Sequence, residues 1–432
     1  MKRIAIIGGG IAGVSAAYAL ARQQTAGAPI TFKLFEATDH LGGIVETERR
    51  DGFIIECGPD SWVTEKRWAR ELAIELGLES EIITSQDKQR KTYLAENGTL
   101  QPMPDGMRMM VPVEWESVLQ SPLFSQQAKI EYQSEPQRAE QLKATALDAA
   151  TPPRDESVRD FIVRHFGAEV ADTIAAPLLA GILGGNIANL STRAVLPAYV
   201  ALEREHGSLI LGLQQKQKSG SPGEAVFTTL QNGVAGLIKG MESHLCASDV
   251  QYGMAAETLE RTENGWIVRT ATSKSYGNEA TEPDEAAEQF DAILLATPAK
   301  ETAKLLAPLN PGIPFLLPQH SSSAIVVALA FSPDQAACLK IPRGFGFLVP
   351  QRKADPVTPG DSSSKNLAEL AQSALLACTF VDQKFPYRAP PGAVLLRAFF
   401  GGDAAPALLK EDDATLAMLA RKSLENILGK LP

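Results

Sequence analysis

Three glycines near the amino terminus, spaced Gly8-x-Gly10-x-x-Gly13, constrain the fold of this chain more than any other feature. A short apolar run, residues 3–7, precedes them, and apolar residues repeat at helical spacing over residues 11–22. This order predicts a buried parallel strand, a tight turn and a helix. Residues 30–35 are predicted to form a second strand that completes a βαβ unit, and such units bind dinucleotides when they carry these glycines.

Each glycine has its own physical role in such a turn. Gly8 permits the tight turn, Gly10 lets the backbone approach a diphosphate, and Gly13 lets the helix pack closely on the strand. The N–H groups at the start of the helix would then hold the diphosphate. Glu36 follows the second strand and is placed to accept hydrogen bonds from ribose hydroxyls, the alternative being a surface carboxylate in a turn.

The glycine motif alone does not distinguish FAD from NAD. The pair Gly42-Gly43, shortly after the acid, resembles the second phosphate-side contact of FAD-dependent enzymes of the amine-oxidase type. An ordinary glycine turn is the alternative interpretation of the pair.

Composition excludes several classes of protein. The chain has 432 residues, which suggests two or three domains, and a net charge of −10, which argues against a nucleic-acid partner. Its four cysteines are far apart and form no CxxC pattern, so we expect no metal site and reduced thiols, as in the cytosol. No apolar stretch reaches 18 residues, so we expect no membrane-spanning helix, whereas contact with a membrane surface stays open.

The middle of the chain differs from its beginning. Residues 85–223 carry several prolines and then helical patterns, such as residues 157–166, which predict an inserted, mostly helical domain. Residues 273–288 and 351–366 lack periodicity and are expected to be solvated loops. Further strands are predicted at residues 53–57, 265–271, 290–296, 323–331, 346–350 and 394–399, and further helices at residues 65–76 and 412–428.

Motifs along most of the chain resemble the protoporphyrinogen oxidase family, whose members are oxygen-dependent and contain FAD. The opening motifs are shared with the wider flavin amine-oxidase superfamily, whereas the later ones are more selective. They are Glu56 with residues 58–62, then residues 100–106, 157–161, 177–185, 190–191, 203–208, 296–298, 344–350 and 384–390.

The resemblance implies an α/β fold. It has a Rossmann-like FAD-binding domain of the flavin amine-oxidase type, an inserted α+β substrate domain and a helical membrane-facing region. On this pattern residues 1–84 and 224–305 form the FAD-binding domain, and residues 85–223 form the helical, substrate-binding insertion. Residues 306–402 supply substrate-domain strands, and residues 403–432 supply a helix leading back to the FAD domain.

The resemblance also implies which residues contact FAD. Two departures from the family pattern are His40, where a basic residue is common, and Ile44, where Lys or Trp is common. The expected FAD contacts are Gly8, Gly9, Gly10, Ile11, Ala12, Gly13, Glu36, Ala37, Gly42, Gly43, Ile44, Gly58, Pro59, Asp60, Ser61 and, through its backbone, Ala256.

The implied activity is oxidation of protoporphyrinogen IX to protoporphyrin IX in heme biosynthesis, with dioxygen as the acceptor. Because the flavin carries the chemistry, no catalytic side chain is expected. Phe385 matches an aromatic that packs on a pyrrole ring, Leu348 an opposing apolar wall, and Gly181 a glycine close to the macrocycle. Arg90 could pair with a propionate, the alternative being a solvated cation.

Several alternatives and partners remain open at this stage. The substrate could be coproporphyrinogen III, and a flavin amine oxidase or carotenoid desaturase is less compatible with the selective motifs. Family members continue beyond residues 412–428 with a glycine-rich turn that this sequence lacks, so an inactive, truncated flavoprotein is a further alternative. The resemblance leaves room for a homodimer, a neighbouring heme-pathway enzyme, and a cytoplasmic location with peripheral contact at the inner face of the cell membrane.

Overall fold

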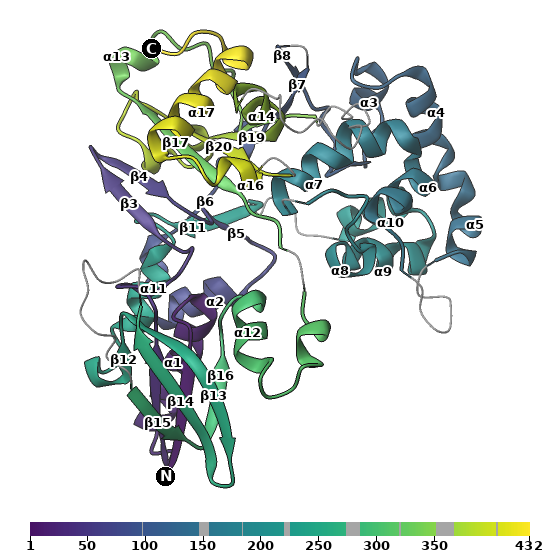
Figure 1. The fold of residues 1–432 in the computed structure, drawn as a ribbon. Coiled ribbons are helices and arrows are strands. Elements are labelled where there is room, and N and C mark those ends of the chain that lie inside the picture. Colours follow the sequence, from purple (N-terminus) through teal and green to yellow (C-terminus); the bar gives the residue numbers. More distant parts are fainter. Residues whose placement is uncertain are drawn as a thin grey trace. The chain divides into compact units, whose positions relative to one another are not determined.

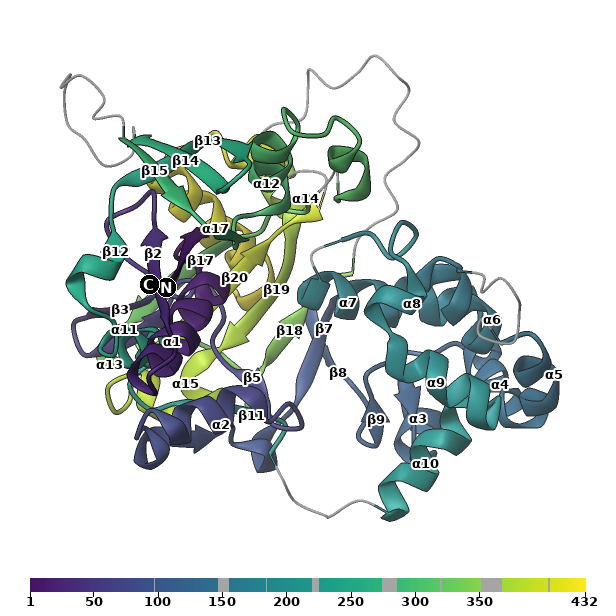
Figure 2. The same cartoon turned by 90° about the horizontal axis from the view of Figure 1, so that it is seen from below.

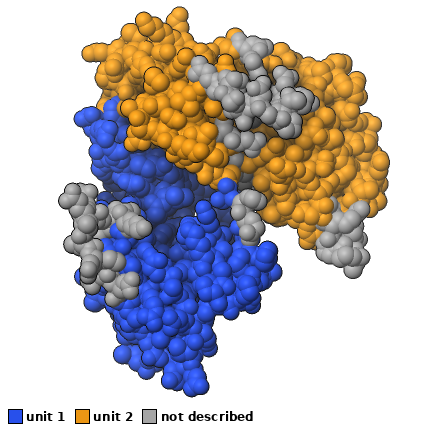
Figure 3. All heavy atoms as spheres, in the orientation of Figure 1, with its two compact units in different colours: residues 1–85, 225–321 blue, residues 86–224, 322–432 orange. Residues whose placement is uncertain are grey.

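The computed structural model describes residues 1–96, 98–146, 155–183, 185–219, 225–273, 286–318, 321–350, 367–402 and 405–432. The chain divides into two compact units, coloured separately in Figure 3. Unit 1 comprises Met1–Ser85 and Ala225–Ser321, and unit 2 comprises Gln86–Glu224 and Ser322–Pro432. The expected loop at residues 351–366, and most of the one at residues 273–288, lie outside the described residues.

A parallel four-stranded sheet in the order β12-β2-β1-β16 forms the centre of unit 1 (Figure 1). Its strands are β1 (Lys2–Ile7), β2 (Ile30–Phe35), β12 (Val250–Gln251) and β16 (Ala292–Leu295), and α1 (Ile11–Thr25) connects the first two. The predicted βαβ unit is therefore confirmed. The strand expected over residues 290–296 is interrupted at Asp291, because residues up to Phe290 pair in another sheet.

Alternate side chains of the parallel sheet enter two different cores. Ile6 and Leu34 pack in one core with residues of α1 and of α11 (Ala235–Glu242). Ala5, Ile7 and Phe35 pack on the opposite face with Val268 and Phe290 from an antiparallel sheet. Burial on both faces explains the apolar run over residues 4–7 of β1.

Smaller sheets complete unit 1. The antiparallel sheet contains β13 (Met254–Thr262), β14 (Gly265–Thr272) and β15 (Ala286–Phe290). The others are the hairpin of β3 (Thr47–Arg50) and β4 (Phe53–Glu56), and the sheet of β5 (Trp62–Val63), β11 (Phe227–Leu230) and β6 (Ile82–Thr84). Its remaining helices are α2 (Trp68–Glu75), η1 (Glu79–Glu81), η6 (Ala247–Asp249), α12 (Ala299–Leu306) and η7 (Ile313–Leu316).

Unit 2 contains a six-stranded sheet in the order β17-β20-β19-β18-β7-β8, visible in Figure 2. Neighbouring strands of this sheet are antiparallel, except that β18 and β7 are parallel. The strands are β17 (Ile325–Phe331), β20 (Val394–Phe400), β19 (Leu375–Phe380), β18 (Gly346–Leu348), β7 (Thr92–Glu96) and β8 (Thr99–Pro102). The segment expected to be mostly helical thus begins with strands, since its pairing partner β18 lies about 250 residues away and leaves no local signal.

Helices pack on this sheet and form a second core in unit 2. The sheet is covered by α17 (Asp413–Leu428), which buries Leu419, Ala420 and Leu424. The helical core gathers Tyr132, Phe161 and Phe166. Its elements are β9 (Met107–Arg108), β10 (Val111–Pro112), α3 (Glu116–Gln120), α4 (Gln126–Ser134), η3 (Pro136–Arg138), α5 (Ala139–Ala144), α6 (Val158–Val170), the π-helix η5 (Ala171–Ala175), α7 (Ala176–Leu183), α8 (Thr192–Val195), α9 (Pro197–His206) and α10 (Leu209–Ser219).

The short connecting helices of unit 2 are η2 (Asp87–Gln89), α13 (Pro333–Ala336), α14 (Leu367–Ala374), α15 (Val381–Lys384), η8 (Pro386–Arg388) and α16 (Ala405–Leu408). Across the described residues, no helix combines the length and the apolar character needed to cross a bilayer. The same residues contain no cluster of His, Cys, Asp or Glu that could hold a metal ion.

Candidate functional site

The turn between β1 and α1 combines one tightly packed glycine with one open glycine. A Cβ placed on Gly13 would overlap the carbonyl oxygen of Gly8, so only glycine lets the helix lie this close to the strand. A Cβ on Gly10 would meet nothing within 4 Å. The backbone at Gly10 therefore borders space that a ligand can occupy, as the spacing of the motif predicts.

The first turn of α1 is suited to an anion. The helical ladder begins with the N–H of Val14, which donates to the carbonyl of Gly10 at 2.9 Å. No acidic residue lies in the first turn of α1, and Gly10 has no side chain that could cap the helix. The backbone N–H groups of this turn and the positive end of the helix dipole favour a bound phosphate.

Glu36, directly after β2, is joined to the glycine turn. Its Oε2 accepts a hydrogen bond from the N–H of Gly9 at 2.6 Å. Its Oε1 accepts from both the N–H and the hydroxyl of Thr38, each at 2.8 Å. Since a carboxylate has about four acceptor positions, the half-buried Glu36 retains capacity for a ribose hydroxyl.

A second glycine turn lies directly beside the first. The N–H of Gly42 donates to the carbonyl of Gly9 at 2.8 Å, and Gly42 forms a parallel bridge with Gly10. A Cβ on Gly43 would lie 3.3 Å from the Cα of Gly10. Gly42 and Gly43 both have positive φ values, 111° and 58°, which glycine adopts most easily. Two segments separated by about 30 residues thus form one glycine-lined surface.

The remaining predicted cofactor residues lie next to these turns or on elements joined to them. A Cβ on Gly58 would overlap the carbonyl oxygen of Ile44, whose side chain is 78% exposed. The hydroxyl of Ser61 donates to Asp60 at 2.7 Å.

Ala256, on β13, is joined to this surface through the backbone. The N–H of Met254 donates to the carbonyl of Glu36 at 2.9 Å. The pairing of β13 with β14 shifts between Ala256 and Thr258, so a bulge directly follows the predicted contact residue. Bulges often occur next to active sites, where they redirect the strand.

His40 supplies a titratable charge beside the second glycine turn. Its Nδ1 lies 2.9 Å from Oδ1 of Asp39, and both side chains are well exposed. The hydrogen bond with Asp39 raises the pKa of His40 above its ordinary value, against a smaller opposing effect of burial. His40 therefore carries positive charge over a wider pH range than an isolated histidine.

Two of the four predicted substrate residues are brought together in unit 2. Gly181 lies on α7 and Leu348 on β18, and a Cβ on Gly181 would lie 3.4 Å from Cδ2 of Leu348. The same Cβ would lie 3.6 Å from Cβ of Ala377, on the neighbouring strand β19. The contact is apolar, and whether these residues meet a substrate stays a prediction.

The other two substrate candidates differ in their exposure. Phe385 is completely buried, and Nζ of Lys384 lies 5.0 Å from its ring centroid. In this structure the ring therefore offers no accessible face for stacking, unlike the ligand-facing aromatic expected from the family. Arg90 is exposed and lies 3.8 Å from Asp87, as the solvated-cation alternative requires. Whether either side chain contacts a substrate stays a prediction.

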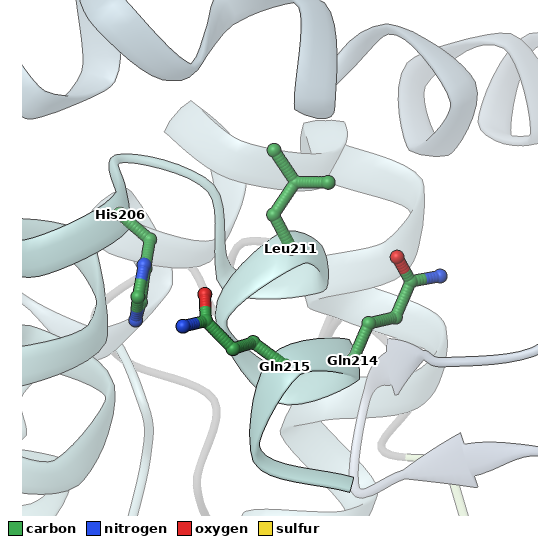
Figure 4. A pocket seen from close by; sticks show the side chains of 4 residues that line it. All are labelled: His206, Leu211, Gln214 and Gln215. Carbon is green, nitrogen blue, oxygen red and sulfur yellow. The ribbon is translucent and has the colours of Figure 1, made fainter. Parts of the chain in front are cut away.

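Figure 4 shows a pocket of unit 2 that the sequence did not predict. It is lined by His206 of α9 and by Leu211, Gln214 and Gln215 of α10, and its volume is about 440 Å³. None of the predicted substrate residues lines it.

Sequence reasoning assigned no role to the buried Glu56, although it belongs to one of the resembling motifs. Its carboxylate accepts the N–H of Val234 at 2.9 Å, 178 residues away along the chain. Its local pattern, an acid at the end of an apolar strand, is also common on protein surfaces and does not indicate this contact.

Comparison with known proteins places these features in a wider group. The family model described as flavin containing amine oxidoreductase matches residues 11–432. Coproporphyrinogen III oxidase of Bacillus subtilis (strain 168) is 31% identical over 99% of this chain and 84% of its own length. The mitochondrial protoporphyrinogen oxidase of Nicotiana tabacum is 28% identical over 99% of this chain and 81% of its own length.

Solved structures agree with this result. A protein of Exiguobacterium sp. 255-15, provisionally named protoporphyrinogen oxidase, matches with a TM-score of 0.76 and 29% identity, covering 100% of this chain and 84% of that one. A putrescine oxidase variant matches with a TM-score of 0.63 and 17% identity, covering 99% of this chain and 82% of that one, which shows likeness of fold alone.

Proposed function

The chain belongs to the flavin-containing amine oxidoreductase family and is an FAD-dependent oxidoreductase, and we propose that it oxidises a porphyrinogen to a porphyrin. The observation that carries this proposal is the similarity over 99% of the chain to an enzyme named coproporphyrinogen III oxidase. Similarity of this extent includes unit 2 as well as the glycine turns, so it concerns the substrate-binding part as much as the cofactor-binding part.

The residues of unit 1 fit FAD. Gly10 leaves space where a side chain would otherwise stand, which suits a diphosphate at the start of α1. Glu36 retains acceptor positions for a ribose hydroxyl, and Gly43 is exposed beside Gly10. When bound, FAD supplies the hydride acceptor for the oxidation.

Unit 2 supplies the surface that would hold the macrocycle. The apolar contact between Gly181 and Leu348 suits a flat, electron-rich ring system. The exposed guanidinium of Arg90 could pair with a propionate of the substrate. Phe385, being buried, would act by supporting this surface, and its contact with a pyrrole ring would require a movement of the surrounding chain. The role of the protein is to bind and orient the ring and to exclude water.

Two porphyrinogens are candidates for the substrate. Coproporphyrinogen III is favoured because relatives with that name reach 31%, 27% and 29% identity, against 28% and 26% for two protoporphyrinogen oxidases. Protoporphyrinogen IX, the substrate expected first from the sequence, is the alternative. The former carries four propionates and the latter two, so the number of cations facing the ring should decide between them.

We also propose a role for each segment of the chain. Residues 1–84 and 224–305 would bind FAD, residues 85–223 and 306–402 would bind the substrate, and residues 403–432 would lead back toward the FAD-binding part. Dioxygen would be the final electron acceptor. We further propose a cytoplasmic enzyme that touches the inner face of the cell membrane, which co-sedimentation with lipid vesicles would test.

The experiment supplies the FAD-loaded protein with each porphyrinogen in air and follows porphyrin fluorescence and hydrogen peroxide. We expect turnover of coproporphyrinogen III above that of protoporphyrinogen IX, with three peroxides for each porphyrin because three two-electron oxidations are needed. Higher turnover of protoporphyrinogen IX would reverse the order of the two substrates. A yellow, folded protein that oxidises neither of them would refute the proposal.

A further inference from the structure

The hairpin of β3 and β4 carries a buried carboxylate. Thr47 and Glu56 face each other across the hairpin, and Glu56 is only 2% exposed. Oε2 of Glu56 accepts the hydroxyl of Thr47 at 2.6 Å, and Oε1 accepts the N–H of Val234 at 2.9 Å. Removing a carboxylate from water costs free energy, and hydrogen-bond partners such as these compensate for that cost.

Together these two side chains cap helix α11. Val234 is the residue before the helix and Ala235 is its first residue, and the N–H of Ala235 donates to Oγ1 of Thr47 at 3.2 Å. A helix has no partners of its own for these N–H groups, and Val234 provides no side-chain cap. The negative charge of a carboxylate near this end also stabilises the helix dipole.

Gly233 makes this close approach possible. Its φ value is 108°, and a Cβ at this position would lie 2.6 Å from Oγ1 of Thr47. The hairpin therefore sits directly against the start of α11, with no space for a side chain between them.

Helix α11 in turn supports the second glycine turn. A Cβ on Gly42 would lie 3.2 Å from Cγ1 of Ile238, so the backbone of this turn rests on the helix. The N–H of Gly42 donates to the carbonyl of Gly9 at 2.8 Å. A displacement of α11 would therefore move Gly42 relative to Gly9, and with it the glycine-lined surface.

We propose that Glu56 and Thr47 are positioning residues for FAD. By capping α11 they hold Ile238 behind Gly42, which keeps the two glycine turns in register for the dinucleotide. Neither side chain has to touch the cofactor. The inference concerns cofactor binding alone, so it is independent of which substrate the enzyme oxidises.

Unit 2 offers a matched control. Glu135 is also completely buried, and its carboxylate accepts the hydroxyl of Ser208 and, at 2.7 Å, the N–H of Leu209 at the start of α10. The arrangement resembles that of Glu56 in capping a helix start, with Nδ1 of His165 at 2.9 Å from Oε1 as an additional partner, and the capped helix belongs to unit 2. A purely structural role predicts that both carboxylates affect stability alone.

The experiment titrates the apoprotein with FAD by flavin fluorescence in Thr47→Val, Thr47→Ser, Glu56→Gln and Glu135→Gln. We expect Thr47→Val and Glu56→Gln to raise the Kd for FAD about 10-fold or more, because each disturbs a hydrogen bond with a charged group. Thr47→Ser keeps the hydroxyl and should restore a Kd near that of the unchanged protein. Glu135→Gln should lower the melting temperature and leave the Kd unchanged.

The visible circular dichroism of flavin bound at saturation gives a second readout, since a displaced glycine turn alters the surroundings of the cofactor. If Glu56→Gln does not fold, the comparison of Thr47→Val with Thr47→Ser decides by itself. A Kd for Thr47→Val within twofold of the unchanged protein, or an equal rise in Glu135→Gln, would overturn the proposal.

Discussion

Oε2 of Glu36 accepts the N–H of Gly9 at 2.6 Å, so the acid after the second strand and the turn after the first are bonded to each other within unit 1. This bond orients the carboxylate that we expect to meet the ribose. It also fixes the middle of the glycine turn, which continues into the open backbone at Gly10. The expected cofactor surface is therefore held in place by hydrogen bonds within the chain, and the open Gly10 and the tightly packed Gly13 lead to different predictions.

Gly10→Val should abolish FAD binding while leaving the fold intact. A Cβ here would meet no protein atom within 4 Å, and the φ value of −63° is open to any residue, but the side chain would fill the space expected for the diphosphate. The ratio of visible flavin absorbance to protein checks this, with Lys300→Ala, on α12, as the surface control. Normal flavin content in the Gly10 variant would remove the diphosphate from this position.

Gly13→Ala should instead destabilise unit 1. The added methyl group would overlap the carbonyl oxygen of Gly8, so the helix must move away from the strand. Overpacking of this kind typically costs about 1–3 kcal/mol. Thermal unfolding of the apoprotein measures the effect without the cofactor. An unchanged melting temperature would show that the close contact between helix and strand is dispensable.

His40 should make FAD binding dependent on pH. Its hydrogen bond with Asp39 raises its pKa, so its positive charge is present at low pH and is lost as the pH rises through that raised value. We expect the Kd for FAD to increase as the pH rises through this raised pKa, which lies above the ordinary histidine pKa of about 6.5. His40→Arg should remove the dependence and keep tight binding, whereas His40→Gln should bind at the weaker level throughout. Parallel pH profiles in all three proteins would exclude His40 as the source.

Phe385→Ala should lower the stability of unit 2. Because the ring is completely buried, its removal leaves a cavity, which typically costs about 3–5 kcal/mol for a buried aromatic side chain. Thermal unfolding measures this loss. Binding of a porphyrin, followed by quenching of its fluorescence well below the melting temperature, then tests the substrate role separately. Weakened porphyrin binding with unchanged FAD affinity would indicate that Phe385 holds the substrate surface from beneath. Unchanged porphyrin binding would remove Phe385 from the site.

Glu203→Gln should weaken the helical core of unit 2 and change its response to acid. Oε1 of Glu203 accepts hydrogen bonds from Arg164 and, at 3.1 Å, from the fully buried His165. Although burial raises the pKa of Glu203, the bonds from His165 and Arg164 outweigh it and hold the pKa below its ordinary value of 4.5.

The stabilisation by Glu203 is therefore complete above its ordinary pKa and is lost as the pH falls through the lowered value. Breaking a buried ion pair typically costs about 3–5 kcal/mol at neutral pH. Urea unfolding at several pH values should show a smaller loss of stability below pH 4.5 in the Gln variant than in the unchanged protein. If both proteins lose stability equally as the pH falls, a group other than Glu203 causes the acid sensitivity.

The sequence determined the local elements of unit 1 and predicted which residues form its cofactor surface. The strand at residues 30–35, the helix from residue 11, and the roles of Gly10 and Gly13 follow from the period of apolar residues and from steric needs that act over a few residues. Motif resemblance extended this to the family, the cofactor and the substrate class, which the comparisons support.

Tertiary structure alone decided the contacts between distant segments. The pairing of β7 with β18, the cap that Glu56 forms on α11, and the burial of Phe385 all join residues that no local pattern relates. A strand pattern shows that a segment needs a partner, but not which one, because backbone hydrogen bonds are the same for every sequence. A buried carboxylate likewise looks like a surface acid until the fold brings a free helix end to it.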